Sequence, residues 1–381
     1  MIFFGLNFLD EAKAQTNGMN EAEQEANRFK DSGMYSEIWK NGEIIFENFI
    51  YDVDDSLLGY HFKVYSNDVI LGYIVVSAIG NIEPIFSFGT GSFLNEELQL
   101  SNEERIYYIN PVAIVAAENV NVLHEQFNSK KAELLETLSG ELALKMRLSN
   151  SSDEAQALYE EIDILQKFEL KPVVERVSEN ANNETEIYSN IVDLNISPYA
   201  SNPLSVRRIY QRTSGVSQPS KACGPTVGAM MSNYYSALGN ESINNSSSYG
   251  GDAAFINHLA GSSFMATGTL GTSLADFENG LRKHLNLNLT SNMFEVARTG
   301  ATSKFSNYKN LIDNGHPVGI RFTNIITAIF GSSAYSWHYV LGTGYSGNNV
   351  LMLDPDGSTS GTKSFNYSTY ESDMNLIWII P

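Results

Sequence analysis

The only cysteine of the 381-residue chain, Cys223, lies in a segment that suits a nucleophile. The motif Cys-Gly-Pro-Thr at 223–226 leads into apolar residues at the spacing of one helical face: Val227, Met230, Met231 and Tyr234. Pro225 fits the first turn of a helix, where its missing N–H is not needed. The unpaired N–H groups and the macrodipole of a helix N-terminus favour a thiolate, so the position predicts an activated sulfur. A lone cysteine can also be a small buried apolar residue, and that alternative stays open.

A thiolate nucleophile needs an imidazole to share and deliver its proton, and His338 is the best placed of the six histidines. His338 opens a predicted strand at 339–345, so its ring should stand at a sheet edge and could face the helix of Cys223. Asp354 ends the next predicted strand, at 350–354, and could orient the imidazole. His338 could instead be a core histidine, and Asp354 merely part of a turn with the Pro-Asp-Gly that follows it.

The hairpin between these two strands decides whether His338 and Asp354 share a face. If residues 346–348 form a three-residue loop, Val340 faces Asp354, and Asp354 lies diagonal to His338 on the same face. A four-residue loop would place the two side chains on opposite faces, because a slip of one residue turns every side chain over.

The periodicity of the chain divides it into two α+β regions. Strands are predicted at 44–51, 61–65 and 69–78, and two or three helices between 120 and 170, interrupted at Gly140 and at 149–152. Residues 177–206 have the Asn, Ser, Glu and Pro composition of a linker. Helices at 225–238, 273–285 and 304–313 then alternate with strands at 318–322, 339–345, 350–354 and 376–380. We therefore expect an N-terminal domain at 1–200 and a second domain at 207–381.

Charge and composition exclude several classes of partner. Residues 1–200 carry 13 Lys and Arg against 34 Asp and Glu, whereas residues 201–381 are close to neutral. Such an acidic surface repels nucleic acid and anionic membranes. No stretch is apolar for long enough to span a bilayer. One cysteine allows no intramolecular disulfide, so hydrophobic cores must hold the fold.

The sequence gives little indication of a metal or another cofactor. No cluster of Cys and His supports zinc, and no phosphate-binding loop is present. Asp354, Asp356 and Gly357 invite comparison with a calcium loop, but the later Glu and the full ladder of ligands are missing. We expect no cofactor.

Four segments together resemble the papain-like family that includes the bacteriocin-leader peptidases and their stand-alone relatives. They are the Cys-Gly-Pro-Thr motif, Asn-Gly-His-Pro-Val at 314–318, His-Tyr-Val at 338–340 and Leu-Asp-Pro at 353–355. The resemblance covers about 207–381. It implies a papain-like fold, with the Cys helix packed on an antiparallel sheet. It also implies Cys223 as nucleophile, His338 as base and Asp354 as orienting acid, the three residues already reached from spacing.

The family also places a Gln upstream of the Cys as oxyanion donor. Gln218 lies five positions before Cys223, close to the family's spacing of about six, and Gln211 is the alternative.

The N-terminal half resembles the propeptide of streptopain-type cysteine peptidases through 72–78, 83–89 and 91–93. The catalytic half departs from streptopain, which has a Trp-rich segment where this chain has Asp-Pro-Asp-Gly at 354–357. The resemblance implies an inhibitory prodomain. The polar linker predicts that its release follows cleavage between Val192 and Arg208, where an exposed, extended chain can enter a protease site. Apolar residues 2–9 and the Ala-Lys-Ala at 12–14 further suggest a signal-peptide remnant, and with it a secreted bacterial protein.

The sequence therefore predicts a cysteine endopeptidase made as a zymogen and acting on a peptide or protein substrate. Two alternatives remain open at this point. One is a catalytically degenerate papain-like protein that binds partners or surfaces, and the other is an amidase or acyltransferase using the same triad on another amide.

Overall fold

The computed structural model describes residues 4–80, 82–94, 101, 104–148, 159, 162–163, 165–173, 175–176, 203–268, 271–290, 293–299, 305–322, 338–356 and 361–381. Its N-terminal half contains α1 (Phe4–Ser32), α2 (Ser36–Trp39), β1 (Glu43–Tyr51), β2 (Leu57–Ser66), β3 (Val69–Ser77), β4 (Ile85–Thr90), β5 (Arg105–Asn110), β6 (Ala113–Ala117) and α3 (Val120–Leu148). Its C-terminal half contains α6 (Cys223–Ala237), α7 (Asp252–Ala260), α8 (Leu274–Leu285), β7 (Glu295–Arg298), α9 (Phe305–Asp313), β8 (Val318–Phe322), β9 (His338–Ser346), β10 (Asn349–Leu353), β11 (Lys363–Asn366), α11 (Tyr367–Tyr370) and β12 (Met374–Ile380).

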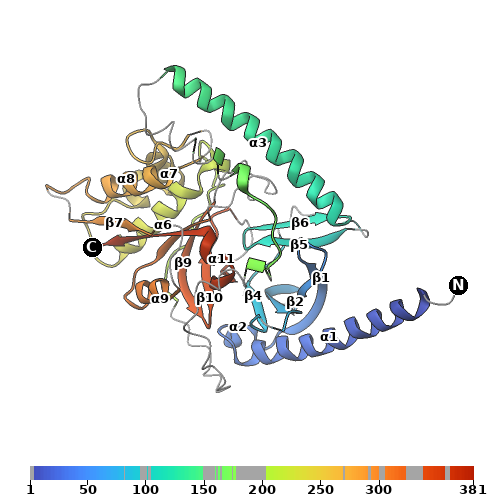
Figure 1. The fold of residues 1–381 in the computed structure, drawn as a ribbon. Coiled ribbons are helices and arrows are strands. Elements are labelled where there is room, and N and C mark those ends of the chain that lie inside the picture. The colour runs from blue at the N-terminus through green and yellow to red at the C-terminus, as the bar shows by residue number, and fades with distance from the viewer. Residues whose placement is uncertain are drawn as a thin grey trace.

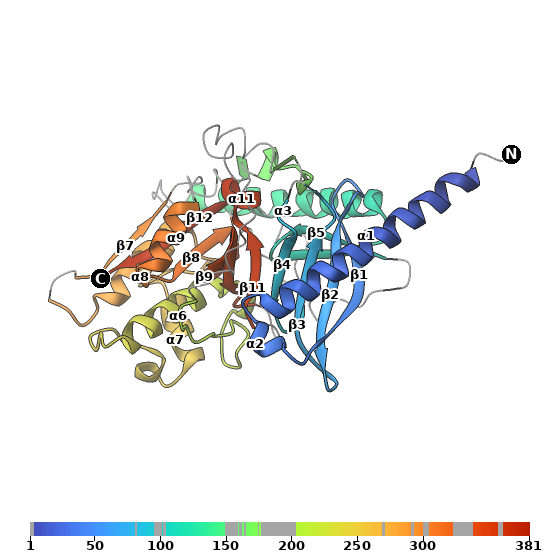
Figure 2. The same cartoon turned by 90° about the horizontal axis from the view of Figure 1, so that it is seen from below.

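The described strands form one sheet of twelve, in the order β6-β5-β1-β2-β3-β4-β11-β10-β9-β8-β12-β7 (Figure 2). The six strands of the N-terminal half lie on one side of it and the six of the C-terminal half on the other. They meet where β4 pairs with β11, at Gly89 opposite Lys363. The predicted division near residue 200 stays a prediction, and the linker at 177–202 lies outside the described residues.

In the N-terminal half, antiparallel strands β1 to β4 carry α1 and α2 on one face. Phe29 of α1 packs between Trp39 and Phe88, with ring centroids 6.3 and 4.8 Å away. Helix α3 runs across the top of both halves in Figure 1, unbroken by Gly140. The expected interruption there is therefore wrong. A glycine within a helix costs only about 1 kcal/mol relative to alanine, which a long helix tolerates.

In the C-terminal half, helices cover both faces of the sheet. Helix α6 packs against β9, and its buried residues share a hydrophobic core with α7 and α8. On the opposite face, Tyr308 of α9 lies across β9 and donates a hydrogen bond to the carbonyl of Gly344 at 2.7 Å. Gly342 must be a glycine here, because a Cβ would come within 2.7 Å of the Tyr308 ring.

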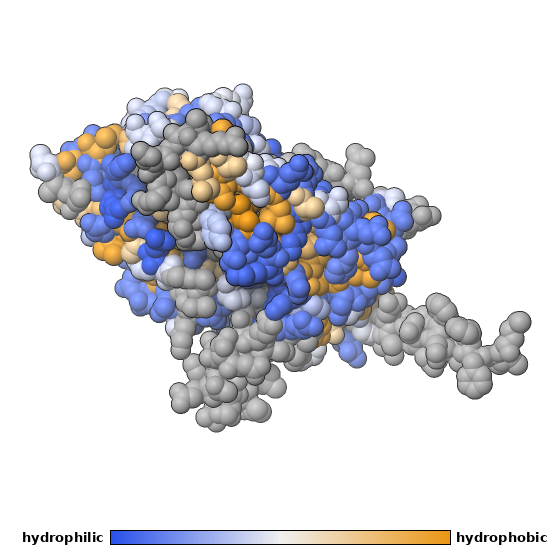
Figure 3. Space-filling model, turned by 45° about the horizontal axis from the view of Figure 1, so that its top comes forward, coloured by the Kyte–Doolittle hydropathy of each residue, from blue (hydrophilic) through white to orange (hydrophobic). Residues whose placement is uncertain are grey.

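One hydrophobic core belongs to both halves. It joins Tyr73, Phe86 and Tyr108 of the N-terminal strands to Phe365 and Tyr370 of the C-terminal half, among others. Arg176 forms an ion pair with Asp373 at 3.2 Å beside this core. On the face shown in Figure 3, hydrophilic residues cover most of the described surface, and hydrophobic ones form small patches between them. Within the described part of the chain, no helix is both long and apolar enough to cross a membrane.

Candidate active site

Cys223 is the first residue of α6, as its sequence context predicts. Ala222 occupies the N-cap position and has no side-chain acceptor, so the N–H groups of the first turn keep their partial positive charge. Pro225 lies in this turn, and its ring replaces an N–H that the helix does not use. Cys223 is completely buried, and so are the nine residues of α6 that follow it, 224–232. The sulfur thus lies inside the protein, at the positive end of a helix.

His338 is the first residue of β9 and pairs with Phe322 of β8. Its Nε2 donates a hydrogen bond to Oδ1 of Asp354 at 2.8 Å, and the ring is almost entirely buried. Burial alone would lower the pKa of His338, but attraction to Asp354 and hydrogen bonds to Asp354 and Cys223 raise it to about 10. Because Nε2 faces Asp354, Nδ1 is the ring atom left to exchange a proton with the thiol. The three side chains are therefore in series.

The position of His338 differs from the expectation in one respect. Strand β9 is an interior strand, between β8 and β10, rather than a strand at the sheet edge. His338 is the first residue of β9, so its ring lies where the strand begins. Because β9 packs against α6, the ring can reach Cys223 from there.

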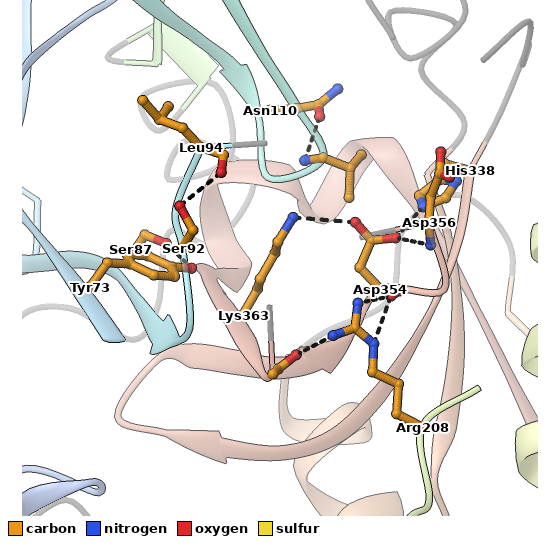
Figure 4. A network of polar contacts seen from close by, with 12 residues as sticks. Tyr73, Ser87, Ser92, Leu94, Asn110, Arg208, His338, Asp354, Asp356 and Lys363 are labelled. Atoms are coloured by element: carbon orange, nitrogen blue, oxygen red, sulfur yellow. Dashed lines mark hydrogen bonds and ion pairs between the residues drawn. The ribbon is translucent and has the colours of Figure 1, made fainter. Parts of the chain in front are cut away.

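Asp354 follows β10 and is the centre of a polar network (Figure 4). Its Oδ1 accepts from His338 and from the backbone N–H of Asp356 at 2.9 Å, and its Oδ2 lies 3.4 Å from Nζ of Lys363. Burial would raise the pKa of Asp354, but the charges of His338 and Lys363 and these hydrogen bonds hold it well below its usual range. The group is therefore a carboxylate at neutral pH.

Arg208 fixes the backbone at Asp354 from a different segment. Its guanidinium donates through Nε and Nη2 to the carbonyl of Asp354, and through Nη1 to the carbonyl of Gly361 at 3.0 Å (Figure 4). Gln211 adds a backbone bond to the carbonyl of Pro355 at 2.9 Å. The turn that carries Asp354 is therefore held by residues that precede α6.

The loop between β9 and β10 has two residues rather than the predicted three, because Ser346 pairs with Asn349. This register would put Leu341 opposite Asp354, on the wrong face for His338. A β-bulge between Gly344 and Gly342 inserts one extra residue and moves the register by one. Leu341 then pairs with Leu353, which brings Val340 opposite Asp354. The predicted loop length is wrong. Because of the bulge, His338 and Asp354 still lie on the same face of the sheet, as the three-residue loop would have placed them.

The two candidate oxyanion donors occupy different environments. Gln218 is exposed and lies just before the short 3-10 helix Pro219–Lys221. Gln211 is fully buried, and its Nε2 donates to the carbonyl of Pro219 at 2.9 Å. Gln218 stays the predicted donor, with Gln211 the alternative.

A cavity of about 190 Å³ adjoins the nucleophile. Its described lining residues carry no charged side chain; they are Val216, Ser217, Gln218, Ala222, Ile256, Asn257, Ala260, Gly261 and Thr267. Asn257 shapes the wall, since its Oδ1 accepts from the N–H of Ser217 and its Nδ2 donates to the carbonyl of Gly215, both at 2.8 Å. Ala222, which directly precedes Cys223, belongs to this lining, and its uncharged described residues suit an uncharged group of a substrate.

Sequence reasoning missed Lys363 and Arg208, which both contact Asp354. Lys363 lies on β11, a strand whose pattern was not recognised, and Arg208 lies near the predicted linker. No local sequence motif marks either residue. Both come close to Asp354 only in the folded protein. Within the described ranges, no group of three His, Cys, Asp or Glu side chains is placed to hold a metal ion.

Residues 203–380 match the model of the Peptidase_C39 like family. The match supports a cysteine peptidase of the C39 type, and hence a hydrolase. The C39-like region has the mixed α+β content expected, with a large sheet. The match begins at residue 203, so the resemblance of the N-terminal half to a propeptide stays a prediction.

Among solved structures, the chain is similar to a crystal structure of a candidate C39-like peptidase from Bacillus anthracis. The two are 15% identical, and the alignment covers 47% of this chain and 98% of the other, with a TM-score of 0.29. At this TM-score the likeness carries no weight for fold or function. No curated protein matches the chain.

Proposed function

We propose that this protein is a cysteine peptidase that hydrolyses peptide bonds through Cys223, His338 and Asp354. The observation that carries the proposal is the series of buried contacts from the helix N-terminus through the imidazole to the carboxylate. A thiol at that position gives its proton to the imidazole, and the carboxylate stabilises the imidazolium that results.

The reaction follows from these positions. The Cys223 thiolate attacks the carbonyl carbon of the scissile peptide, and the carbonyl electrons move to the oxygen. The N–H groups at the start of α6, with Gln218 or Gln211, would donate to this oxyanion. The imidazolium of His338 gives its proton to the leaving amine, so that a thioester remains. His338 then takes a proton from water, which hydrolyses the thioester and restores the thiol.

The test is a stoichiometric label with a peptidyl electrophile directed at thiols, combined with turnover of an unstructured protein substrate. We expect one label per chain on Cys223. Cys223→Ala and His338→Ala should each lower turnover by at least about 10³-fold while the circular dichroism spectrum stays unchanged. Cys223→Ala removes the nucleophile and little volume. A purified Cys223→Ala variant that still cleaves peptides at the wild-type rate would refute the proposal.

The same label separates the two alternatives. A correctly folded protein whose Cys223 does not react would be a binding protein on a peptidase fold. A protein that reacts, but turns over only small amides or transfers acyl groups, would be an amidase or acyltransferase.

We also propose that the full chain is a zymogen in which residues 1–200 restrain the peptidase. The burial of Cys223 and His338 supports this, because a substrate carbonyl must reach the sulfur. Leu138 of α3 shares the hydrophobic core that contains Cys223, so the restraint would act through apolar packing. Activity should rise only after the chain has been cleaved in the window from Val192 to Arg208 and residues 1–200 have left the catalytic half. The N-terminal half is not an inhibitor if the intact chain is as active as a fragment that starts near Arg207, and if added residues 1–200 do not lower the activity of that fragment.

Export from a bacterial cell is proposed on the sequence alone. Helix α1 runs through the Ala-Lys-Ala at 12–14, so a signal peptidase would need this segment extended during export. N-terminal sequencing of protein recovered from the medium of an expressing bacterium tests the proposal, and a start at or near Gln15 is expected.

A further inference from the structure

Asp354 has a second charged neighbour besides His338. The ammonium of Lys363 lies 3.4 Å from Oδ2, whereas His338 uses Oδ1 (Figure 4). The side chain of Lys363 is 18% exposed and that of Asp354 is 7% exposed. An ion pair this far from bulk water is only weakly screened by salt. The carboxylate thus lies between two cationic groups, one on each oxygen.

Residues 361–364, which carry Lys363, are bound to the N-terminal half through strand β4. Lys363 pairs with Gly89, and the residues around it bond to Thr90: the N–H of Gly361 donates to the Thr90 carbonyl at 2.9 Å, and that of Thr362 to the Thr90 hydroxyl at 3.1 Å.

The next residue, Ser364, is held in the same way. Its hydroxyl accepts from the N–H of Phe88 at 2.7 Å, and its carbonyl accepts from the hydroxyl of Ser87 at 2.8 Å. Residues 87–90 of the N-terminal half therefore fix the backbone from which the Lys363 side chain extends.

We propose that Lys363 is a positioning residue for the Cys223–His338–Asp354 site, and that strand β4 of the N-terminal half holds it in place. The inference rests on the proposed function of these three residues. The ammonium holds Oδ2, so that Oδ1 stays directed at the imidazole. It also offsets part of the carboxylate charge and so weakens the attraction that keeps His338 protonated.

The other charged groups around Asp354 do not replace Lys363. His338 comes from β9 and is the group being tuned. Arg208, from the segment before α6, binds the backbone carbonyl of Asp354 rather than its carboxylate. Asp356, in the same turn, is paired with Arg212. The carboxyl pKa of Asp354 is lowered in part by the charge of Lys363, which agrees with the geometry.

The first experiment removes the charge and keeps the side-chain length. In Lys363→Met, loss of the ammonium should move the alkaline limb of the kcat/KM profile to higher pH by about 0.5–1 unit, because His338 then holds its proton more tightly. Lys363→Arg should keep the limb at the wild-type pH. The matched control is Lys63→Met, which breaks a comparable ion pair with Glu47 in the N-terminal half, 2.6 Å long and away from the site. A limb in Lys363→Met that stays in place or moves to lower pH overturns the proposal.

The second experiment tests the role of β4. A Cβ at position 89 would overlap the carbonyl oxygen of Thr362 and lie 2.8 Å from the Tyr73 ring, so Gly89→Ala should force β4 and β11 apart. We expect the same upward shift of the limb as in Lys363→Met, and no added shift in the double variant. Gly80→Ala is the control, since a Cβ there meets nothing within 4 Å. If Gly89→Ala folds and the limb keeps its wild-type position, the N-terminal half does not hold Lys363.

A readout that needs no turnover separates this inference from the proposed function. The ring nitrogens of His338 can be followed by NMR in protein labelled at histidine, with His338→Ala to assign the signal. A raised titration point in Lys363→Met, in a protein that cleaves no peptide, would support the inference and reject the peptidase. An active peptidase whose His338 titrates identically in the wild type and in Lys363→Met would reject the inference alone.

Discussion

At the residue scale, the proposed chemistry depends on one imidazole that lies between a thiol and a carboxylate in the protein interior. Burial works against both charged partners, and each is kept ionised by the other. Removing one partner of a buried ion pair destabilises the protein by more than the pair contributes when it is intact. The reason is that the remaining charge stays buried without compensation. The pH dependence of the reaction should therefore report the charge of Asp354 directly.

The first prediction concerns that charge. Asp354→Asn keeps an oxygen that can accept from Nε2 of His338 but removes the negative charge that raises the pKa of His338. The imidazolium should then lose its proton at lower pH, so the alkaline limb of kcat/KM moves down, opposite to the shift expected for Lys363→Met. Profiles between pH 5 and 10.5 measure this shift. An unchanged limb in Asp354→Asn would mean that Asp354 orients the ring without tuning it.

The second prediction separates the two candidate oxyanion donors. Removal of a side-chain donor to the oxyanion costs about 10²–10³ in kcat. Gln218→Ala should show that loss with little change in stability, since Gln218 is exposed. Gln211→Ala should lower stability, because it removes a fully buried side chain that bonds to Pro219. If kcat falls by this factor in Gln211→Ala but stays at the wild-type value in Gln218→Ala, then Gln211 is the oxyanion donor.

At the element scale, the hairpin of β9 and β10 carries the site, and its register depends on the bulge at Thr343. Helix α9 packs across this bulge, with the Tyr308 hydroxyl on the carbonyl of Gly344 and the Tyr308 ring against Gly342. The helix therefore supports the irregular backbone that brings His338 and Asp354 to one face.

The third prediction follows from this contact. Tyr308→Phe leaves the buried carbonyl of Gly344 without its side-chain donor, which should cost about 1–2 kcal/mol of unfolding free energy. Urea unfolding followed by fluorescence gives the value. Tyr234→Phe is the control, because its hydroxyl bonds to the carbonyl of Gly315 at a partly exposed site and should contribute less. Equal losses in the two variants would contradict the role given to α9.

At the scale of the whole molecule, the two halves share a sheet and a hydrophobic core. Even the strand that follows the orienting acid, β11, has one neighbour from each half. A zymogen built in this way must open within a shared core before its N-terminal half can leave.

The fourth prediction is that cutting the linker does not by itself separate the halves. Protein cleaved between Val192 and Arg208 should elute as one species on gel filtration, and should still do so in 1 M salt, because apolar contacts are not screened. Separation should require urea or heat. Two separate peaks in dilute buffer would show that the β4–β11 pairing and the shared core are too weak to hold the halves together.

The candidate residues of the site and most of the elements around them could be predicted from the sequence. A cysteine before Gly-Pro at the start of an amphipathic pattern, and a strand that opens with a histidine, are local signals, and α6, α8, α9 and β8 begin within two residues of their predicted starts. Period and capping rules act over a few residues, so one chain is enough to read them.

The remaining features depend on contacts that form only in the folded chain. The two-residue loop and its compensating bulge depend on packing against Tyr308, and the pairing of Lys363 with Asp354 depends on where β4 joins β11. These contacts join residues far apart in the chain, up to 274 positions for the Gly89–Lys363 pair, and no local pattern encodes them. Local patterns thus indicated the candidate residues of the proposed site, while long-range packing determined their register and their charged surroundings.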